Sequence, residues 1–196
     1  TAVNPKDPRF GHILITPKTA WINCDLRGPL LRELNVPVGY DTDVNVACLG
    51  EAVFGAAKGL SNVIYVTIGT GIGAGVMIEG NLLHGMLHAE AGHIHVERVP
   101  GDDFKCNCPY HDCCLEGMAA GPAIEKRWGK KGYELAGNDK VWDIESSYIA
   151  QGVATYILCY SPQKIVLGGG VMKQEQMFPQ VRQKTLKLLG GYLVTP

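Results

Sequence analysis

Cysteine and histidine residues are crowded into one short stretch of this sequence. Two residues separate Cys108 from His111 and His111 from Cys114, and His93 lies fifteen residues before Cys108. Thiolate sulfur and imidazole nitrogen are ligands typical of tetrahedral zinc, and short spacings let neighbouring ligands reach one ion. Four protein ligands would complete the coordination sphere, so we predict a structural zinc site in the loop 93–114.

The spacing alone leaves the ligand set open. Cys106, Cys113 and His95 lie in the same stretch and compete for the same ion. A group of free thiols without metal is the alternative interpretation. A disulfide framework is disfavoured, because its cysteines would be spread along the chain to connect distant loops.

Acidic residues near this loop are candidates for proton transfer and for binding hydroxyl groups. Asp43 lies at an expected strand-to-helix junction, where a lone aspartate is most often an N-cap but can also be a general base. Glu90 precedes His93, and Glu116 follows the last cysteine of the loop. Taken singly, each is more often a solvated or capping residue, so only their placement around the loop suggests a site.

A glycine-rich turn precedes this region. The chain contains 25 glycines in 196 residues, well above the usual share of about 7%. Residues 69–74 fit the dinucleotide pattern G-x-G-x-x-[GA], but a strand pattern follows them where a helix is required. We therefore predict a hairpin whose backbone and Thr70 hydroxyl contact phosphate oxygens, the alternative being an ordinary hairpin turn.

Composition limits the class of protein. There are 18 basic and 19 acidic residues, and a net charge of −1 indicates neither nucleic acid nor an anionic membrane as partner. Hydrophobic residues make up 46% and charged residues 19%, which is typical of a globular chain. No apolar run approaches the roughly 18 residues of a spanning helix and no signal segment opens the chain, so we expect a soluble, cytoplasmic protein.

The pattern of apolar residues predicts a mixed sheet. Strands are expected at 12–16, 36–40, 62–68, 72–79, 82–84 and 164–167, the last of them buried. Helices are expected at 28–35, after residues 41–43, and at 123–128, 138–160 and 174–189. A β-meander followed by helix, strand and helix indicates an α/β fold.

Five motifs occur in an order that resembles a known family. They are DTDVN at 41–45, GTGIG at 69–73, EAGH at 90–93, the cysteine loop with Glu116, and GGGV at 168–171. Over almost the whole chain they resemble the ROK family of repressors and bacterial sugar kinases, and especially its zinc-containing fructokinases. The resemblance implies an actin-like, ribonuclease H-like ATPase fold, with sugar and ATP in the cleft between two α/β domains.

The resemblance also implies a division of the chain. Residues 1–45 would be the C-terminal part of a small N-terminal domain, and 46–196 a large ATP- and sugar-binding domain that contains the loop 93–114. These kinases use a first phosphate hairpin near their N-terminus, and no such motif precedes Asp43. We therefore expect the sequence to be a segment of a longer protein and the 196 residues alone not to turn over ATP.

The implied activity is ATP-dependent phosphorylation of a hexose. Thr42 stands where glucose-specific members carry asparagine, and Pro109 and His111 replace the glycine-containing loop of those members, so fructose is the expected sugar. The resemblance makes Asp43 the base that deprotonates the sugar hydroxyl. It assigns sugar binding to Glu90, His93, Glu116 and Asn45, and zinc binding to His93, Cys108, His111 and Cys114.

The resemblance further implies a nucleotide site, with Mg²⁺ on the phosphates and a homodimeric protein. Gly69, Thr70 and Gly71 would contact the ATP phosphates. Gly121, Pro122, Gly168, Gly169 and Gly170 would border the nucleoside. The alternative function is a sugar-sensing repressor of the same family whose DNA-binding domain lies outside this chain.

Overall fold

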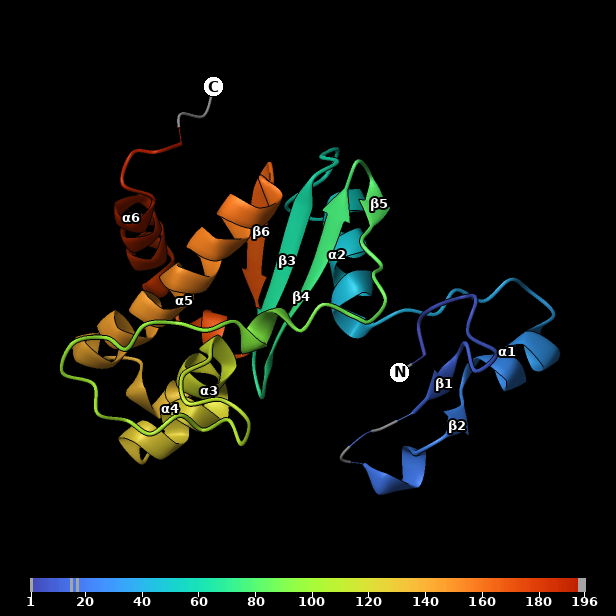
Figure 1. The fold of residues 1–196 in the computed structure, drawn as a ribbon, viewed down its shortest axis with the longest axis horizontal. Coiled ribbons are helices and arrows are strands. Elements are labelled where there is room, and N and C mark those ends of the chain that lie inside the picture. The colour runs from blue at the N-terminus through green and yellow to red at the C-terminus, as the bar shows by residue number, and fades with distance from the viewer. Residues whose placement is uncertain (1, 15, 17, 194–196) are drawn as a thin grey trace.

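The computed structural model describes residues 2–14, 16 and 18–193. Figure 1 shows a larger part built around a sheet, and a small N-terminal part joined to it by an extended linker. The sheet has the order β5-β4-β3-β6. The α/β fold with a mixed sheet is therefore confirmed.

The N-terminal part contains little regular structure. β1 (His12–Ile13) pairs antiparallel with β2 (Cys24–Asp25), and these are followed by α1 (Arg27–Leu34). A short 3-10 turn, Thr19–Trp21, lies between the two strands. The strand expected at 12–16 is thus found at its first two residues, while residue 15 lies outside the described part of the chain.

The strand expected at 36–40 is wrong. The Arg27 Nε donates to the Val38 carbonyl at 2.9 Å, and the Tyr40 ring contacts the Phe10 ring edge-on at 6.0 Å between centroids. In the segment 36–40, the carbonyl of Val38 therefore accepts a hydrogen bond from the Arg27 side chain instead of from the backbone of a neighbouring strand. An apolar extended run becomes a strand only where another strand can pair with it.

The central sheet begins as the predicted meander. β3 (Val63–Ile68) pairs antiparallel with β4 (Ile72–Ile78), and β4 pairs antiparallel with β5 (Asn81–Leu82). β6 (Lys164–Gly168) returns parallel to β3, with Val63 opposite Lys164. β6 is half-buried rather than fully buried as expected, because it forms one edge of the described sheet.

Helices cover both faces of the sheet (Figure 1). α2 (Asp43–Val53) packs on one face, where Val63 and Met77 meet Cys48 and Ala52. The other face carries the larger core, formed with α3 (Leu115–Ala119), α4 (Gly121–Trp128), α5 (Asp139–Tyr160) and α6 (Met177–Leu189). Among the described residues, no helix is both long and apolar enough to cross a bilayer.

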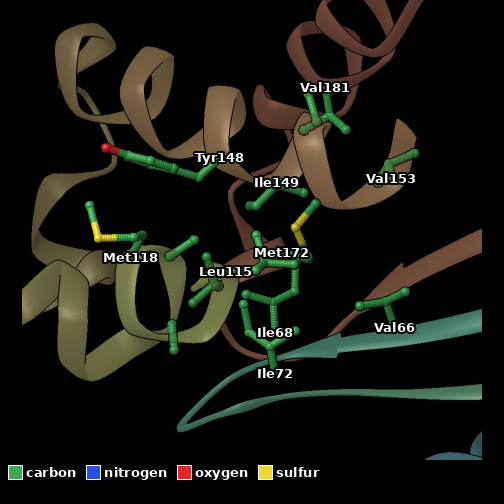
Figure 2. Packing of buried hydrophobic residues seen from close by; sticks show 14 of the residues in the cluster. Val66, Ile68, Ile72, Leu115, Met118, Tyr148, Ile149, Val153, Met172 and Val181 are labelled. Atoms are coloured by element: carbon green, nitrogen blue, oxygen red, sulfur yellow. The ribbon is translucent and has the colours of Figure 1, made fainter. Parts of the chain in front are cut away.

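Figure 2 shows the larger core, in which strand residues Val66, Ile68 and Ile72 lie beneath Leu115 and Ile149. The long helix α5 begins one residue after its expected start, and the Asn138 side chain caps it by accepting from the Val141 amide. α3 was not expected from the sequence, because five residues are too few to show a helical apolar period. α6 begins three residues later than expected, after the 3-10 turn Val171–Lys173.

A buried arginine fastens the loop that precedes the cysteine cluster. The Arg127 side chain is 5% exposed and lies between the carboxylates of Asp102, at 3.1 Å, and Glu145. Its guanidinium also lies 4.4 Å from the centre of the Phe104 ring, and Trp128 Nε1 donates to Glu145 at 3.0 Å. Burial raises the pKa of Glu145 to about 7, an effect that Arg127 and Trp128 oppose. Arg127 therefore joins the loop to α4 and α5.

We expect Arg127→Leu to lower the free energy of unfolding by about 3–5 kcal/mol, because it leaves two buried carboxylates without their cation. Urea denaturation of the variant and the wild type measures this difference. The control is Lys130→Leu at an exposed position, which should change stability by no more than about 0.5 kcal/mol. Equal losses in the two variants would contradict a special role for Arg127.

Candidate functional site

Four side chains of the cysteine loop converge on one point. Suitable ligand atoms of His93, Cys108, His111 and Cys114 all lie within 4.8 Å of one another. The His93 Nδ1 lies 3.8 Å from the Cys108 sulfur and 3.7 Å from the Cys114 sulfur, and the His111 Nδ1 lies 3.3 Å from the Cys108 sulfur. Tetrahedral zinc with ordinary bond lengths requires nitrogen–sulfur distances of roughly 3.5 Å. The donor set and its spacing therefore fit zinc.

Local structure brings these four residues together. His93 ends the 3-10 turn Ala91–His93, and Cys114 is the N-cap of α3, where its sulfur accepts from the Gly117 amide at 3.4 Å. A backbone bridge pairs His95 with Cys114 and closes the loop. A Cβ on Gly117 would overlap with the sulfur of Cys106, so the helix can approach the loop only with glycine there.

The competing ligands lie outside this group. Among the described residues, the cluster does not include Cys106, Cys113 or His95. The side chain of His95 is exposed. Burial raises the pKa of the Cys114 thiol to about 12, so this thiol keeps its proton at neutral pH unless a cation displaces it. The geometry thus favours the ligand set that the family resemblance implies.

Glu116 links the cluster to the glycine hairpin. In the first turn of α3, its Oε2 accepts from the Ile72 amide at 2.8 Å, and its Oε1 lies 3.7 Å from the His93 Nε2. His93 therefore presents Nδ1 to the two sulfurs and Nε2 to a carboxylate. A carboxylate beyond the ligating nitrogen is the usual device that orients a metal-bound imidazole.

Asp43 is the first residue of α2 and not its cap. The N-cap is Thr42, whose hydroxyl accepts from the Asn45 amide at 3.3 Å, so the capping interpretation of Asp43 is wrong. The Asp43 side chain is exposed, and its Oδ1 accepts from the neighbouring Val44 amide at 3.0 Å. Its carboxylate is therefore accessible to a substrate.

Asn45 is buried beside a pair of residues that the sequence analysis missed. Its amide nitrogen donates to the Asp41 Oδ1 at 2.7 Å, and the Asp41 Oδ2 lies 2.7 Å from the His84 Nε2. Asn45 is 1% exposed, so any contribution to a sugar site would be made through its neighbours. The proximity of Asp41 to Asp43 was visible in the sequence, but nothing there paired it with His84.

The segments that carry Asp43 and His93 both adjoin the first half of β4. Val44 packs against Gly73, and a Cβ on Gly75 would overlap with the Val44 carbonyl. The turn that ends at His93 packs at the start of the same strand, where a Cβ on Gly92 would overlap with the Ile72 carbonyl. Glu90 begins this turn, and its exposed side chain lies outside the core.

A cleft of about 650 Å³ lies next to the hairpin, a size typical of small-molecule sites. Gly121 binds the hairpin directly, since its amide donates to the Gly69 carbonyl at 2.7 Å. Five of the residues predicted to bind the nucleotide line the cleft: Gly69, Thr70, Gly121, Pro122 and Gly170. The other lining residues were not expected from the sequence; they are Ile124, Glu125, Lys131, Gly132, Tyr133, Trp142, Val171, Lys173 and Gln174.

Three predicted nucleotide residues lie outside the lining of this cleft. Gly71 lies beside Glu116, where an added Cβ would be 2.7 Å from the carboxylate. Gly168 packs against the Tyr65 ring, and Gly169 has a φ of +92° close to the Ile68 backbone. The structure therefore gives Gly168 and Gly169 a role in the tight turn after β6.

Two curated relatives of this chain are both named fructokinase. The chain is 50% identical to a fructokinase from Pediococcus pentosaceus, over 99% of this chain and 67% of that protein. It is 42% identical to a fructokinase from Streptococcus mutans, again over 99% of this chain and 67% of that protein. The chain thus spans about two thirds of the length of these curated relatives.

A solved structure shares the fold. The chain superimposes on a ROK family glucokinase from Streptomyces griseus, in complex with glucose and AMPPNP, with a TM-score of 0.75 and 26% identity. The match covers 94% of this chain and 69% of that one. The family model described as the ROK family matches residues 3–196. This chain therefore belongs to the ROK family.

Proposed function

We propose that the protein transfers the γ-phosphoryl group of ATP to a hexose, with fructose as the preferred sugar. The observation that carries this proposal is the 50% identity to a fructokinase over 99% of the chain. The accessible Asp43, the oriented His93 and the cleft beside the hairpin supply groups that such a reaction needs. The same identity favours a kinase over the repressor alternative.

Asp43 is the proposed general base. Its exposed carboxylate would accept the proton of the sugar hydroxyl while the hydroxyl oxygen attacks the γ-phosphorus and the bond to ADP breaks. Proton transfer of this kind contributes about 10²–10⁴ to the rate. The first turn of α2 fixes the backbone at this residue, because Thr42 caps it and Val44 packs against β4.

The sugar would lie between Asp43 and the cysteine loop. Glu90, His93 and Glu116 are the proposed partners of its hydroxyl groups, and Asn45 would act through Asp41, to which it donates. The His93 imidazole suits this task because its Nδ1 faces the two sulfurs of the cluster and its Nε2 lies 3.7 Å from the Glu116 carboxylate. Correct orientation of the hydroxyl toward Asp43 is the expected result.

ATP would occupy the cleft of about 650 Å³. Thr70 and the backbone of Gly69 and Gly71 would contact the phosphates, and Gly121, Pro122 and Gly170 would lie at the nucleoside. Gly168 and Gly169 would act by shaping the adjacent turn. Mg²⁺ bound with ATP neutralises charge on the phosphoryl group during transfer.

A zinc ion held by His93, Cys108, His111 and Cys114 would be structural. Four protein ligands leave no open position, so the ion would supply folding energy and fix the loop. The division into a small domain through residue 45 and a large domain from residue 46 stays a prediction. The homodimer also stays a prediction, and sedimentation velocity would measure this oligomeric state.

Asp43→Asn should lower kcat by about 10²–10⁴ with little change in sugar affinity, because it removes the base and preserves the shape of the side chain. Coupled ADP release by the full-length protein, with a panel of hexoses, gives kcat, and calorimetry gives affinity. The matched control is Asp139→Asn, which also changes an exposed aspartate at the first position of a helix. A variant that turns over like the wild type would exclude Asp43 as the base.

Cys108→Ser should reduce bound zinc from about one ion per chain to well below that and lower the melting temperature, because a neutral hydroxyl replaces a thiolate ligand. Elemental analysis and thermal unfolding measure both effects. Cys159→Ser, at an exposed cysteine outside the cluster, should change neither. Purified protein that lacks metal, and whose melting is unaffected by a strong chelator, would argue against the zinc site.

A further inference from the structure

A histidine after β5 binds the chain immediately before α2. The His84 Nε2 lies 2.7 Å from the Asp41 Oδ2, and the two residues are 43 positions apart in the sequence. The other oxygen, Asp41 Oδ1, accepts from the Thr42 amide at 2.8 Å and from the Asn45 side chain at 2.7 Å. One carboxylate thus joins the loop after β5 to the N-cap and first turn of α2.

The linker changes its attachments at this point. Before it, Val38 accepts from Arg27 and the Tyr40 ring contacts Phe10, so these residues belong with the N-terminal part. Asp41 instead binds His84, which follows the sheet of the larger part. In Figure 1 the linker enters the first turn of α2 beside the chain that descends from β5.

This attachment adds to the Thr42 cap and the packing of Val44, which also hold the backbone at Asp43. The Asp43 carboxylate accepts from the next amide in the chain, Val44, and is otherwise exposed. The placement of that carboxylate therefore follows the backbone of residues 41–45. His84 lies on the segment that leads on toward Glu90 and His93, so its bond to Asp41 connects the start of α2 with the segment that carries the other side of the proposed sugar site.

We propose that His84 is a positioning residue for phosphoryl transfer, holding Asp43 in register with the sugar through its hydrogen bond to Asp41. This inference rests on the proposed kinase function. A neutral imidazole with hydrogen on Nε2 donates this bond, so the link does not require a protonated histidine. The His84 side chain is 40% exposed, and a pair this accessible contributes little to the free energy of unfolding.

The kinetic test uses the full-length protein with ATP and fructose. His84→Leu should lower kcat by about 10- to 100-fold, because small displacements of a reacting group have effects of this size, while KM for the sugar changes less than about threefold. His84→Gln should recover kcat to within about threefold of wild type, because its amide can donate from a similar position. Met86→Ala, at an 89% exposed residue of the same loop, is the control and should match wild type.

A double variant tests the path of the effect. If His84 acts through Asp41, then His84→Leu combined with Asp41→Asn should lose no more kcat than the larger single loss. Independent, additive losses would overturn the inference. Unchanged kcat in His84→Leu would overturn it as well and would leave the kinase function intact.

Amide hydrogen exchange tests the attachment without relying on turnover. His84→Leu should speed exchange in residues 42–46 by up to about fivefold, which is the effect expected from losing an accessible pair, whereas His84→Gln and Met86→Ala should leave it near wild type. Equal exchange in all four proteins would refute the proposed link. Wild-type protein that releases no ADP with any hexose would refute the kinase function, and the positioning role with it, whatever the exchange rates show.

Discussion

The first residues of β4 hold three distant segments of the chain against one another. The Ile72 amide is bound by Glu116 of α3, and the Ile72 carbonyl packs against Gly92 beside His93. Further along the same strand, Gly73 and Gly75 admit the first turn of α2 so closely that any larger side chain at Gly75 would displace it. Backbone that is already fixed in a sheet is a rigid support, so the groups placed on it need little reorganisation for chemistry.

The cysteine loop, residues 93–114, is held at two places by different groups. Near the cluster, four soft ligands and Glu116 define its shape, while further along Arg127 attaches it to the helices. The loop also packs apolar side chains, among them Val96, Val99 and Phe104, against the larger core. Arg127 supplies one attachment through a buried ion pair, and the proposed zinc ion would supply the other.

Much of this arrangement could be predicted from the sequence. Alternating apolar residues indicated the meander, the amphipathic pattern of 138–160 indicated α5, and two-residue spacings indicated the cluster. The strand expected at 36–40 failed because strand formation depends on a partner, and α3 was too short to show a period. The Asp41–His84 contact joins residues 43 positions apart, and such tertiary pairs leave no local pattern.

The half-buried strand β6 forms one edge of the described sheet. Within the described chain its neighbour is β3, and its outer side borders an apolar groove that includes Phe178, Val181 and Leu186. Exposed backbone donors and acceptors on such a margin are a template for foreign strands, and Lys164 supplies the strand's single charge against this. A further strand would therefore add to the described sheet at this edge, by β-augmentation.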